Sequence, residues 1–303
     1  TVASPNPEES AALAMAVAQA EATGADLVIG CDPDTDRVGI AVNDGTGKMQ
    51  LLNGNDTAAL LVHYILDAYK TNGTLPANGF TAATVVTTDL IADISAAYGV
   101  PCYRCLTGFK WIADIINNKP EEQFLVGGEE SYGYLIGDEV RDKDAVASAV
   151  MIAEMAANAK AQGRTVLQQL EAIHREFGQY QERLIAVTKK GRSGAQEIAD
   201  MMTALRNDPP KTLAGSPVII AIDHGKSTQT DLLTGATSST ELPASNVLQF
   251  ITEAGDKVSA RPSGTEPKIK FYFSVRATTG DSHAATKAEL ERKIDTFIEE
   301  LNL

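Results

Sequence analysis

Short apolar runs alternate with longer amphipathic stretches between residues 55 and 177, and this alternation constrains the fold more than any other feature of the sequence. The expected helices are NDTAALLVHYILDAYK, DLIADISAAYG, GFKWIADIIN and an Ala-rich segment that begins near Asp144. The expected strands between them are TAATVVTT, VPCYRC and FLVGG. Such alternation predicts a mostly parallel sheet that is covered by helices.

The pattern differs on either side of this block. Asn6 as N-cap, Pro7 in the first turn and Gly24 after the end predict a helix over residues 7–23. After about Gly178, one internal helix and a final one in SHAATKAELERKIDTFIEEL are expected, with strands near residues 181–187, 217–223, 246–252 and 268–275. This order of strands and helices predicts a separate α+β domain. The polar segment HGKSTQTDLLTGATSST is interpreted as a loop or a weakly ordered insertion.

Composition argues against several classes of partner. The 303 residues carry a net charge of −14, which disfavours nucleic acid because phosphate backbones are bound by clustered Lys and Arg. No apolar run approaches the roughly 18 residues of a membrane span, and no charged-then-apolar leader is present, so we expect a cytoplasmic protein without a membrane partner. The three cysteines give no disulfide framework. Cys102 and Cys105 are interpreted as ordinary thiols, because residues three apart on a strand face opposite sides.

The segment GCDPDTDRVGIAV, residues 30–42, holds three aspartates at alternate positions: Asp32, Asp34 and Asp36. Carboxylates this close raise one another's pKa unless a cation or a set of donors compensates, and oxygen-only ligands suit Mg2+. A solvated acidic turn is the alternative, but the apolar flanks ADLVIGC and VGIAV place the aspartates at a strand end, where α/β proteins hold ligands. A calcium loop of the EF-hand type fails, because Arg37 and Asn43 stand where it needs Gly and Glu.

Three further loops carry polar residues suited to a phosphorylated sugar. GGEESYGYLIGDEVRDKD, from Gly127, combines carboxylates and a hydroxyl that could bind ring hydroxyls, and its polar residues are Glu129, Glu130, Ser131, Arg141 and Lys143. RPSGTEPKIKFYF joins two strands through a turn that could cradle a phosphate, and its polar residues are Arg261, Ser263, Thr265 and Lys268, with Gly264 between them. TGFKW, from Thr107, opens a helix beside Lys110. The alternatives are a glycine-rich turn with solvated charges, a plain hairpin and a solvated lysine.

In this order, DPDTDR, TGFK, GEESYG with RDKD, and RPSGTEPK resemble the characteristic loops of the α-D-phosphohexomutase superfamily, the phosphoglucomutases and phosphomannomutases. The likeness extends over nearly the whole chain. It implies the C-terminal part of a metal-binding second domain over residues 1–54, a sugar-binding third domain over 55–177 and a phosphate-binding fourth domain over 178–303. The implied fold class is α/β: two consecutive mutase-type domains, the first partial, with mixed sheets covered by helices, and a C-terminal α+β domain.

The resemblance also assigns roles to residues. It implies that Mg2+ is held by Asp32, Asp34 and Asp36. It implies that Arg37 lies near a phosphoserine and that Lys143 is a general acid or base. The substrate-binding residues that it implies are Thr107, Gly108, Lys110, Glu129, Ser131, Arg261, Ser263, Gly264, Thr265 and Lys268.

By the same resemblance, a phosphoserine gives its phosphoryl group to one sugar oxygen, the hexose 1,6-bisphosphate intermediate reorients, and the other phosphate returns to the serine. The serine of the family lies in a TASHNP-like loop, a whole domain before the metal loop. Ser4 stands too close to Asp32 in the sequence to be this residue. We therefore expect a fragment that begins within the second domain, is inactive alone and has the missing N-terminal domain as its partner.

Two other functions stay open. A non-catalytic sugar-phosphate binding module would use the same loops without phosphoryl transfer. A Mg-dependent sugar phosphatase of the haloacid dehalogenase type uses DxDx[TV], and Asp36 stands where Thr or Val is expected. Glucose, mannose and pentose phosphates would all fit one such set of loops, so the sugar is not specified.

Overall fold

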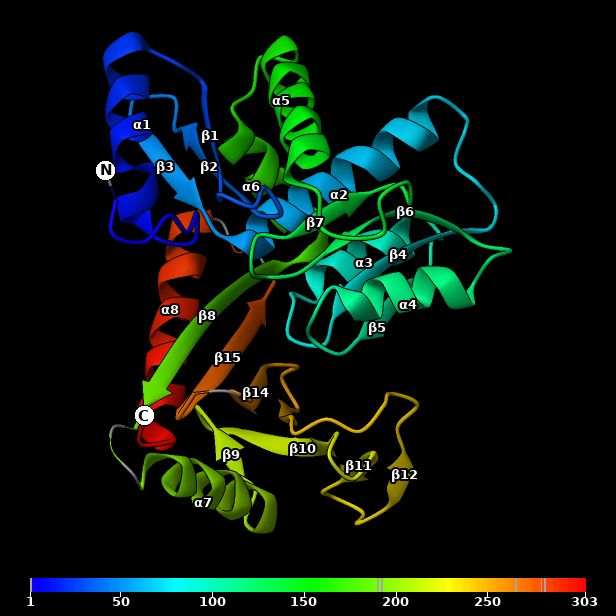
Figure 1. Cartoon of the computed structure of the whole chain (residues 1–303), viewed down its shortest axis with the longest axis vertical. Helices are drawn as coiled ribbons and strands as arrows, with labels where there is room; N and C mark the ends of the chain where they lie inside the picture. The colour runs from blue at the N-terminus through cyan, green and yellow to red at the C-terminus, as the bar shows by residue number, and fades with distance from the viewer. Residues whose placement is uncertain (1, 190, 192, 265, 279, 281) are drawn as a thin grey trace. The chain divides into compact units, whose positions relative to one another are not determined.

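Figure 1 shows the computed structural model of the whole chain, which describes residues 2–189, 191, 193–264, 266–278, 280 and 282–303. The chain divides into two compact units, Thr1–Phe177, called unit 1 here, and Gly178–Leu303, called unit 2. In the described part of the chain, no helix combines the length and the apolar character that crossing a bilayer requires.

Unit 1 begins with a helix that covers a three-stranded sheet. The elements are α1 (Ser10–Thr23), β1 (Leu27–Cys31), β2 (Val38–Asn43) and β3 (Met49–Leu52), and the sheet order is β1-β2-β3, with both pairs antiparallel. Leu13 and Ala20 of α1 pack against Val28 and Ala41 of the sheet. The helix ends at Gly24 as predicted but starts at Ser10, three residues later than expected. The Asn6 side chain accepts the Glu8 N–H instead, within the turn that precedes the helix.

The rest of unit 1 is a mixed sheet between helices. Its elements are α2 (Gly54–Thr71), β4 (Gly79–Thr84), α3 (Leu90–Ala97), β5 (Cys102–Cys105), α4 (Lys110–Asn118), β6 (Gln123–Gly128), β7 (Tyr134–Ile136), α5 (Ala145–Ala161) and α6 (Val166–Phe177). The sheet order is β5-β4-β6-β7, in which β4 runs parallel to β5 and β6 while β7 is antiparallel to β6. Phe80 and Phe124 meet edge to face in the core, with ring centroids 5.5 Å apart. The carboxyl ends of β4, β5 and β6 therefore lead into loops at one edge of the sheet.

The predicted strand TAATVVTT is too long. Strand β4 ends at Thr84, and Val85–Thr88 form a turn. The backbone of this turn is held by side chains, because the Asn55 amide oxygen accepts the Thr88 N–H at 2.9 Å and Arg104 donates to the Thr87 carbonyl at 2.7 Å.

In its described residues, unit 2 is built on one antiparallel sheet with two helices. Its elements are β8 (Gln179–Thr188), α7 (Gly194–Asn207), β9 (Thr212–Leu213), β10 (Ser216–Asp223), β11 (Thr228–Asp231), β12 (Thr237–Ser239), β13 (Leu248–Thr252), β14 (Lys257–Pro262), β15 (Lys268–Ala277) and α8 (His283–Glu300). The strand order is β12-β11-β10-β13-β14-β15-β8, with β9 paired to β10 outside this path. Phe250, Phe271 and Phe273 of the sheet form one core with Ile294 and Phe297 of α8.

The polar segment that was interpreted as a loop is partly strand. Its residues form the antiparallel pair β11 and β12, with Gln229 opposite Ser238. The alternation of apolar and polar residues that predicts a strand is absent here because neither strand has a buried face: β11 is half-buried throughout and β12 is exposed. The α/β fold class with a C-terminal α+β domain is confirmed.

Candidate functional site

The acidic loop is the connection of the antiparallel hairpin β1–β2, not a turn after a parallel strand as the α/β argument implied. Asp32 is buried, and the loop is built around its carboxylate. Its Oδ1 accepts the backbone N–H groups of Asp36 at 3.1 Å and of Arg37 at 3.0 Å. Its Oδ2 accepts Nε of Arg37 at 2.7 Å.

These bonds decide the charge of Asp32. Burial raises the pKa of this carboxyl, but the hydrogen bonds from the backbone and side chain of Arg37, together with its charge, outweigh burial and hold the pKa below the ordinary value. Asp32 is therefore ionised at neutral pH, as a metal ligand must be.

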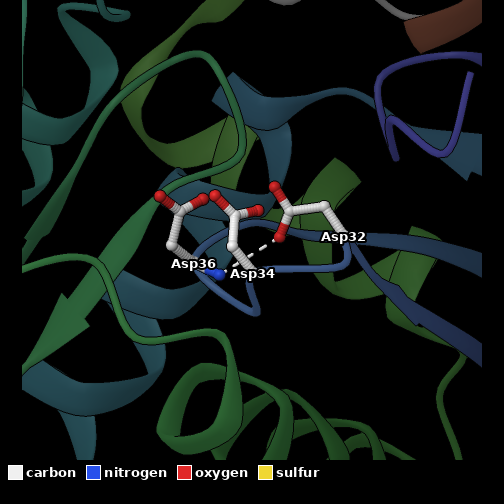
Figure 2. Close-up of side chains that lie close together, drawn as sticks. All are labelled: Asp32, Asp34 and Asp36. Carbon is white, nitrogen blue, oxygen red and sulfur yellow. Dashed lines mark hydrogen bonds between the residues drawn. The ribbon is translucent and has the colours of Figure 1, made fainter.

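The carboxylates of Asp32, Asp34 and Asp36 lie side by side (Figure 2), and each offers an oxygen within 4.8 Å of the others. Asp34 is exposed and Asp36 is half-buried. Three carboxylate oxygens at this spacing are the donor set that a hard divalent cation prefers. The residues therefore fit Mg2+ in chemistry and spacing.

Lys143 connects the acidic loop to the RDKD segment. Its Nζ lies 2.8 Å from Oδ2 of Asp36. Burial lowers the pKa of Lys143, but the bond to Asp36 outweighs burial, so the pKa is raised above the ordinary lysine value. The side chain passes over Gly133, where a Cβ atom would lie 2.4 Å from Cδ of Lys143. Gly133 therefore makes room for the lysine.

Two backbone hydrogen bonds fix the same loops to each other. The carbonyl of Thr35 accepts the N–H of Ala145, the first residue of α5, at 3.2 Å. The carbonyl of Tyr132 accepts the N–H of Val38, the first residue of β2, at 3.0 Å. The acidic loop, the GEES loop and the start of α5 thus form one connected set within unit 1.

The GEES loop is bonded in turn to the TGFK loop. Glu129 is buried, and its Oε1 accepts the N–H of Gly108 at 2.8 Å, just before α4 begins at Lys110. Gly108 has φ +110°, a backbone conformation that favours glycine. Thr107 and Ser131 are half-exposed beside these two residues. Lys110 is exposed and lies over the Trp111 ring, with Nζ 5.0 Å from the centroid.

Arg141, a polar residue of the same segment, is directed elsewhere. Its guanidinium donates to the Asn117 side chain near the end of α4 and pairs with Asp138 at 3.8 Å. Arg141 therefore stabilises the GDEVRDKD turn through these two contacts.

The predicted phosphate loop lies in unit 2, at the hairpin between β14 and β15. Arg261 and Lys268 are half-buried in the two strands, and Gly264 is exposed, with open space where a Cβ atom would be. The N–H of Ser263 donates to the Lys268 carbonyl at 2.7 Å, so this amide closes the hairpin rather than facing a ligand as expected. Thr265 lies outside the described residues.

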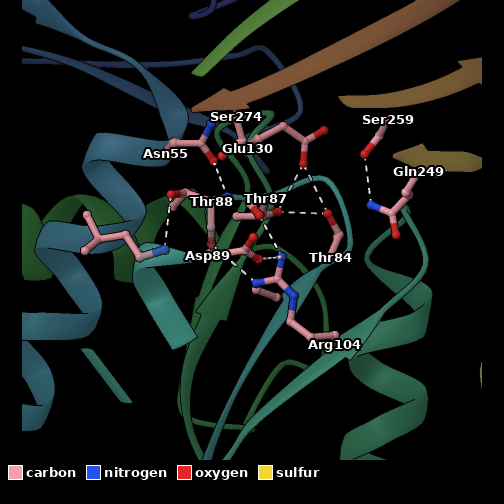
Figure 3. Close-up of polar contacts among 12 residues, drawn as sticks. Asn55, Thr84, Thr87, Thr88, Asp89, Arg104, Glu130, Gln249, Ser259 and Ser274 are labelled. Atoms are coloured by element: carbon pink, nitrogen blue, oxygen red, sulfur yellow. Dashed lines mark hydrogen bonds and ion pairs between the residues drawn. The ribbon is translucent and has the colours of Figure 1, made fainter. Parts of the chain in front are cut away.

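Sequence reasoning missed a polar cluster at the carboxyl end of β4 (Figure 3). The hydroxyls of Thr84 and Thr87 contact the Glu130 carboxyl, while Arg104 of β5 pairs with Asp89 at 3.1 Å. The signal that could have found it is the run TVVTTD directly after a buried strand, opposite the second glutamate of GEES. The described residues of unit 1 thus place a candidate cation site, Lys143 and the buried carboxylate of Glu129 on loops that hydrogen bonds connect.

Comparison with protein families gives two matches. Residues 53–177 match the model of phosphoglucomutase/phosphomannomutase α/β/α domain III, and residues 1–46 match that of domain II. The chain is 38% identical over 276 residues to a phosphoglucomutase of Staphylococcus epidermidis, which covers 91% of this chain and 50% of the relative. It is 37% identical over 278 residues to a probable phosphomannomutase of Haemophilus influenzae, covering 91% of this chain and 51% of the relative. The chain therefore spans about half the length of the curated relatives that it matches.

Solved structures share the fold. The open form of pp63/parafusin from Paramecium, a phosphoglucomutase by its description, aligns with a TM-score of 0.66 at 17% identity, over 98% of this chain and 50% of that chain. A putative phosphomannomutase from Thermus thermophilus aligns with a TM-score of 0.61 at 17% identity, over 98% and 50% of the two chains. At this level of identity the likeness is one of fold.

Proposed function

Because the chain belongs to the phosphoglucomutase/phosphomannomutase family, within the α-D-phosphohexomutase superfamily, we propose that it serves to interconvert sugar 1-phosphates and 6-phosphates. Glucose is the first candidate sugar, with mannose and pentose phosphates as alternatives. The observation that carries the proposal is the Lys143–Asp36 contact of 2.8 Å, which joins the acidic loop to the segment that holds the GEES residues. An acidic turn that is merely solvated would not be expected to contact this segment.

The proposed roles in unit 1 follow from the donors and acceptors present. Asp32, Asp34 and Asp36 would hold Mg2+, which when bound supplies positive charge near a transferring phosphoryl group. Lys143, kept protonated by its raised pKa, would donate a proton or a hydrogen bond to a substrate oxygen. Sugar hydroxyls would be bound by Glu129 and Ser131, with Thr107, Gly108 and Lys110 along the same edge. Arg37 fixes Asp32 and would orient the metal ligands.

In unit 2, the phosphate of the substrate would be bound at the β14–β15 hairpin. A guanidinium and an ammonium on neighbouring strands are suited to an anion, and exposed Gly264 lets one approach the backbone. The proposed residues are Arg261, Ser263, Gly264, Thr265 and Lys268.

The phosphoserine mechanism with a hexose 1,6-bisphosphate intermediate is part of the proposal. No segment of the 303 residues has the TASHNP-like pattern at the expected distance before Asp32. The nucleophile would therefore come from the N-terminal domain that is proposed as the partner of this chain. We therefore expect the 303-residue chain to bind the bisphosphate without catalytic turnover. The cytoplasmic location stays a prediction from the sequence.

Binding and turnover can be separated in one series of experiments. Glucose 1,6-bisphosphate is titrated into the chain with and without Mg2+ by calorimetry. Glu129→Gln and Arg261→Ala should each weaken binding about tenfold, which is about 1.4 kcal/mol. Inorganic phosphate should respond to Arg261→Ala alone, because Glu129 is assigned to hydroxyls. Asp114→Asn, an exposed change on α4, is the matched control.

The outcomes distinguish the functions. Release of inorganic phosphate from glucose 1-phosphate, abolished by Asp32→Asn, would favour the phosphatase. Bisphosphate binding without isomerisation, even by a chain extended with an N-terminal domain of a relative, would favour the binding module. Bisphosphate affinity that neither Glu129→Gln nor Arg261→Ala changes would refute the site assignment.

A further inference from the structure

Glu130, the second glutamate of the GEES loop, is part of a triangle of oxygens with two threonines (Figure 3). Its Oε2 lies 3.3 Å from Oγ1 of Thr84 and 3.2 Å from Oγ1 of Thr87. The two threonine hydroxyls lie 2.8 Å from each other. All three residues come from loops or strand ends at the edge of the sheet where Glu129 binds Gly108.

The triangle contains more contacts than the threonines have protons. A hydroxyl donates one proton, and an ionised carboxylate donates none. With Glu130 ionised, two protons must serve three contacts, and one contact stays unmade. With Glu130 protonated, the acid donates to one threonine, this threonine donates to the other, and the second donates back to the carboxyl. The third proton therefore completes the triangle.

The two threonine contacts of Glu130 are long, so they do not require an ionised carboxylate. Hydrogen bonds from a hydroxyl to an ionised carboxylate are typically about 2.5–2.7 Å long. Both threonine contacts of Glu130 exceed 3.1 Å, whereas the bond between the two neutral threonines is 2.8 Å.

The charged neighbours favour the proton as well. Among the ion pairs of the described residues, none includes Glu130: Arg104 is paired with Asp89, and Lys143 with Asp36. Glu129 is adjacent on the same loop, and Asp56 lies in the first turn of α2, which packs against the Glu130 backbone. Burial and then the charge of Glu129 outweigh the hydrogen bonds from Thr84 and Thr87, which lower the pKa, and raise the pKa of Glu130 to about 7.

We propose that Glu130 is a positioning residue: its proton closes the Thr84–Thr87 triangle and so holds the loop of residues 128–133 in the form that presents Glu129 and Ser131 to the sugar. The inference rests on the proposed function for the identity of the ligand, although the loop itself can be observed without one. When Glu130 ionises, the triangle loses a bond and two adjacent carboxylates repel each other. The backbone of Glu130 cannot retreat toward α2, because a Cβ at Gly54 would already lie 1.9 Å from its carbonyl oxygen.

The sign of the pH dependence follows from this assignment. The loop conformation that binds the sugar contains protonated Glu130. Its population is therefore highest below the raised pKa and falls as the pH rises through about 7. Affinity for glucose 1,6-bisphosphate should then fall about tenfold for each further pH unit, because the binding-competent fraction falls in that proportion.

Glu130→Gln is the decisive variant. Its amide can donate from Nε2 to one threonine while the two threonines keep their mutual bond, so at every pH it should supply the donor that only the protonated acid supplies. We expect its affinity for the bisphosphate to be level from about pH 7 to about pH 9, above the second phosphate pKa of about 6, while the parent chain loses affinity over this range. Glu130→Ala should bind weakly throughout, and the exposed Glu121→Gln should behave like the parent chain. A parent chain and a Glu130→Gln variant with the same pH profile would overturn the proposal.

The fluorescence of Trp111 can report the state of the loop of residues 128–133 without a ligand. Trp111 is the single tryptophan of the chain and lies three residues after Gly108, the partner of Glu129. Its fluorescence should titrate near neutral pH in the parent chain and not in Glu130→Gln. If this titration is present but no bisphosphate binds at any pH, the loop assignment stands and the proposed function fails. If the fluorescence titrates identically in both chains, the loop assignment fails whatever the chain binds.

Discussion

Asp32 has two tasks at the scale of a single residue. Its carboxylate accepts three hydrogen bonds from Asp36 and Arg37, which shape the loop, and it also offers an oxygen to the candidate cation site. A metal ligand that is fixed by local donors is positioned before the metal arrives, and this lowers the cost of ordering the site. Asp34 of the same loop is exposed.

This difference predicts a pH-dependent stability effect for Asp32→Asn. Because the pKa of Asp32 is lower in the folded chain than its ordinary value of 3.8, ionised Asp32 contributes stability that is fully present above that value and is lost as the pH falls through the folded-state pKa. The variant should unfold about 1–3 kcal/mol more easily at neutral pH, since hydrogen bonds to a buried charge are lost. The difference from the parent chain should shrink in acid. Urea unfolding followed by Trp111 fluorescence measures both.

Asp34→Asn is the matched control for this experiment. It removes the same charge from the same loop but breaks none of the hydrogen bonds around Asp32, so the unfolding free energy should stay level or rise slightly as repulsion falls. Equal losses in both variants, or a loss in Asp32→Asn that does not depend on pH, would contradict the role given to Asp32.

Backbone strain marks the same loops. Thr35, Tyr132 and Arg141 have φ values of 59°, 68° and 58°, in a left-handed region that residues with a side chain rarely adopt. Thr35 and Tyr132 each give a carbonyl to the hydrogen bonds that join the acidic loop to its neighbours. Strained residues persist only where the surroundings fix them, and they gather at functional sites. The strain at Thr35 and Tyr132 is therefore held by the same hydrogen bonds that connect these loops.

At the scale of elements, the start of α2 supports the GEES loop. The Asn53 side chain caps the helix by accepting the Asp56 N–H at 2.8 Å. The Gly54 carbonyl accepts the Tyr134 hydroxyl at 3.0 Å, and the Gly54 Cα faces the Glu130 carbonyl. Helix and loop thus approach each other more closely than any side chain would allow.

Gly54→Ala should force them apart. The added Cβ would lie 1.9 Å from the Glu130 carbonyl oxygen, which is backbone and cannot rotate away. We expect the free energy of unfolding to fall by about 1–3 kcal/mol, the usual cost of overpacking, and bisphosphate binding to weaken. Asp114→Ala, an exposed change on α4 in the same unit, is the control. Urea unfolding followed by Trp111 tests both variants, and a Gly54→Ala chain as stable as the parent would rule out the close contact.

Two helix ends that sequence predicted well, the end of α1 before Gly24 and the start of α5 after Asp144, carry their own signals. Asp144 caps α5 at the expected place, where its carboxylate accepts the N–H groups of Val146 and Ala147. TAATVVTT was too long as a strand because the bonds that pull Thr87 and Thr88 out of the sheet come from Asn55 and Arg104, which are distant in sequence.

The candidate site likewise has features that local sequence indicates and features that depend on residues distant in sequence. Residue types at loops indicated carboxylates for a cation and polar groups for a sugar and a phosphate, since chemistry can be inferred from local composition. The Lys143–Asp36 contact and the Glu130 triangle join segments of different strands, and no local pattern specifies them. The Ser263 amide, expected to face a phosphate, closes its own hairpin because the strand register requires that bond.

At the scale of the whole molecule, each unit has its own core. Phe80, Phe124 and Ile112 belong to a cluster in unit 1, against which Trp111 packs, whereas Phe271 and Phe297 belong to the cluster of unit 2. Trp111 fluorescence therefore reports the unfolding of unit 1, while circular dichroism reports both units. A ligand that binds only folded unit 1 must shift the first signal.

Mg2+ provides this test, because all three candidate ligands belong to unit 1. At a hundred times its dissociation constant, Mg2+ should stabilise unit 1 by about 2.7 kcal/mol, and the Trp111 unfolding midpoint should move to higher urea. Asp36→Asn should abolish most of this shift, because it removes a ligand, whereas Asp114→Asn should leave it intact. Ionic strength is matched with a monovalent salt, since general screening would affect both variants alike. A shift that survives Asp36→Asn would mean that the ion binds elsewhere, and the acidic loop would then lose its assigned role.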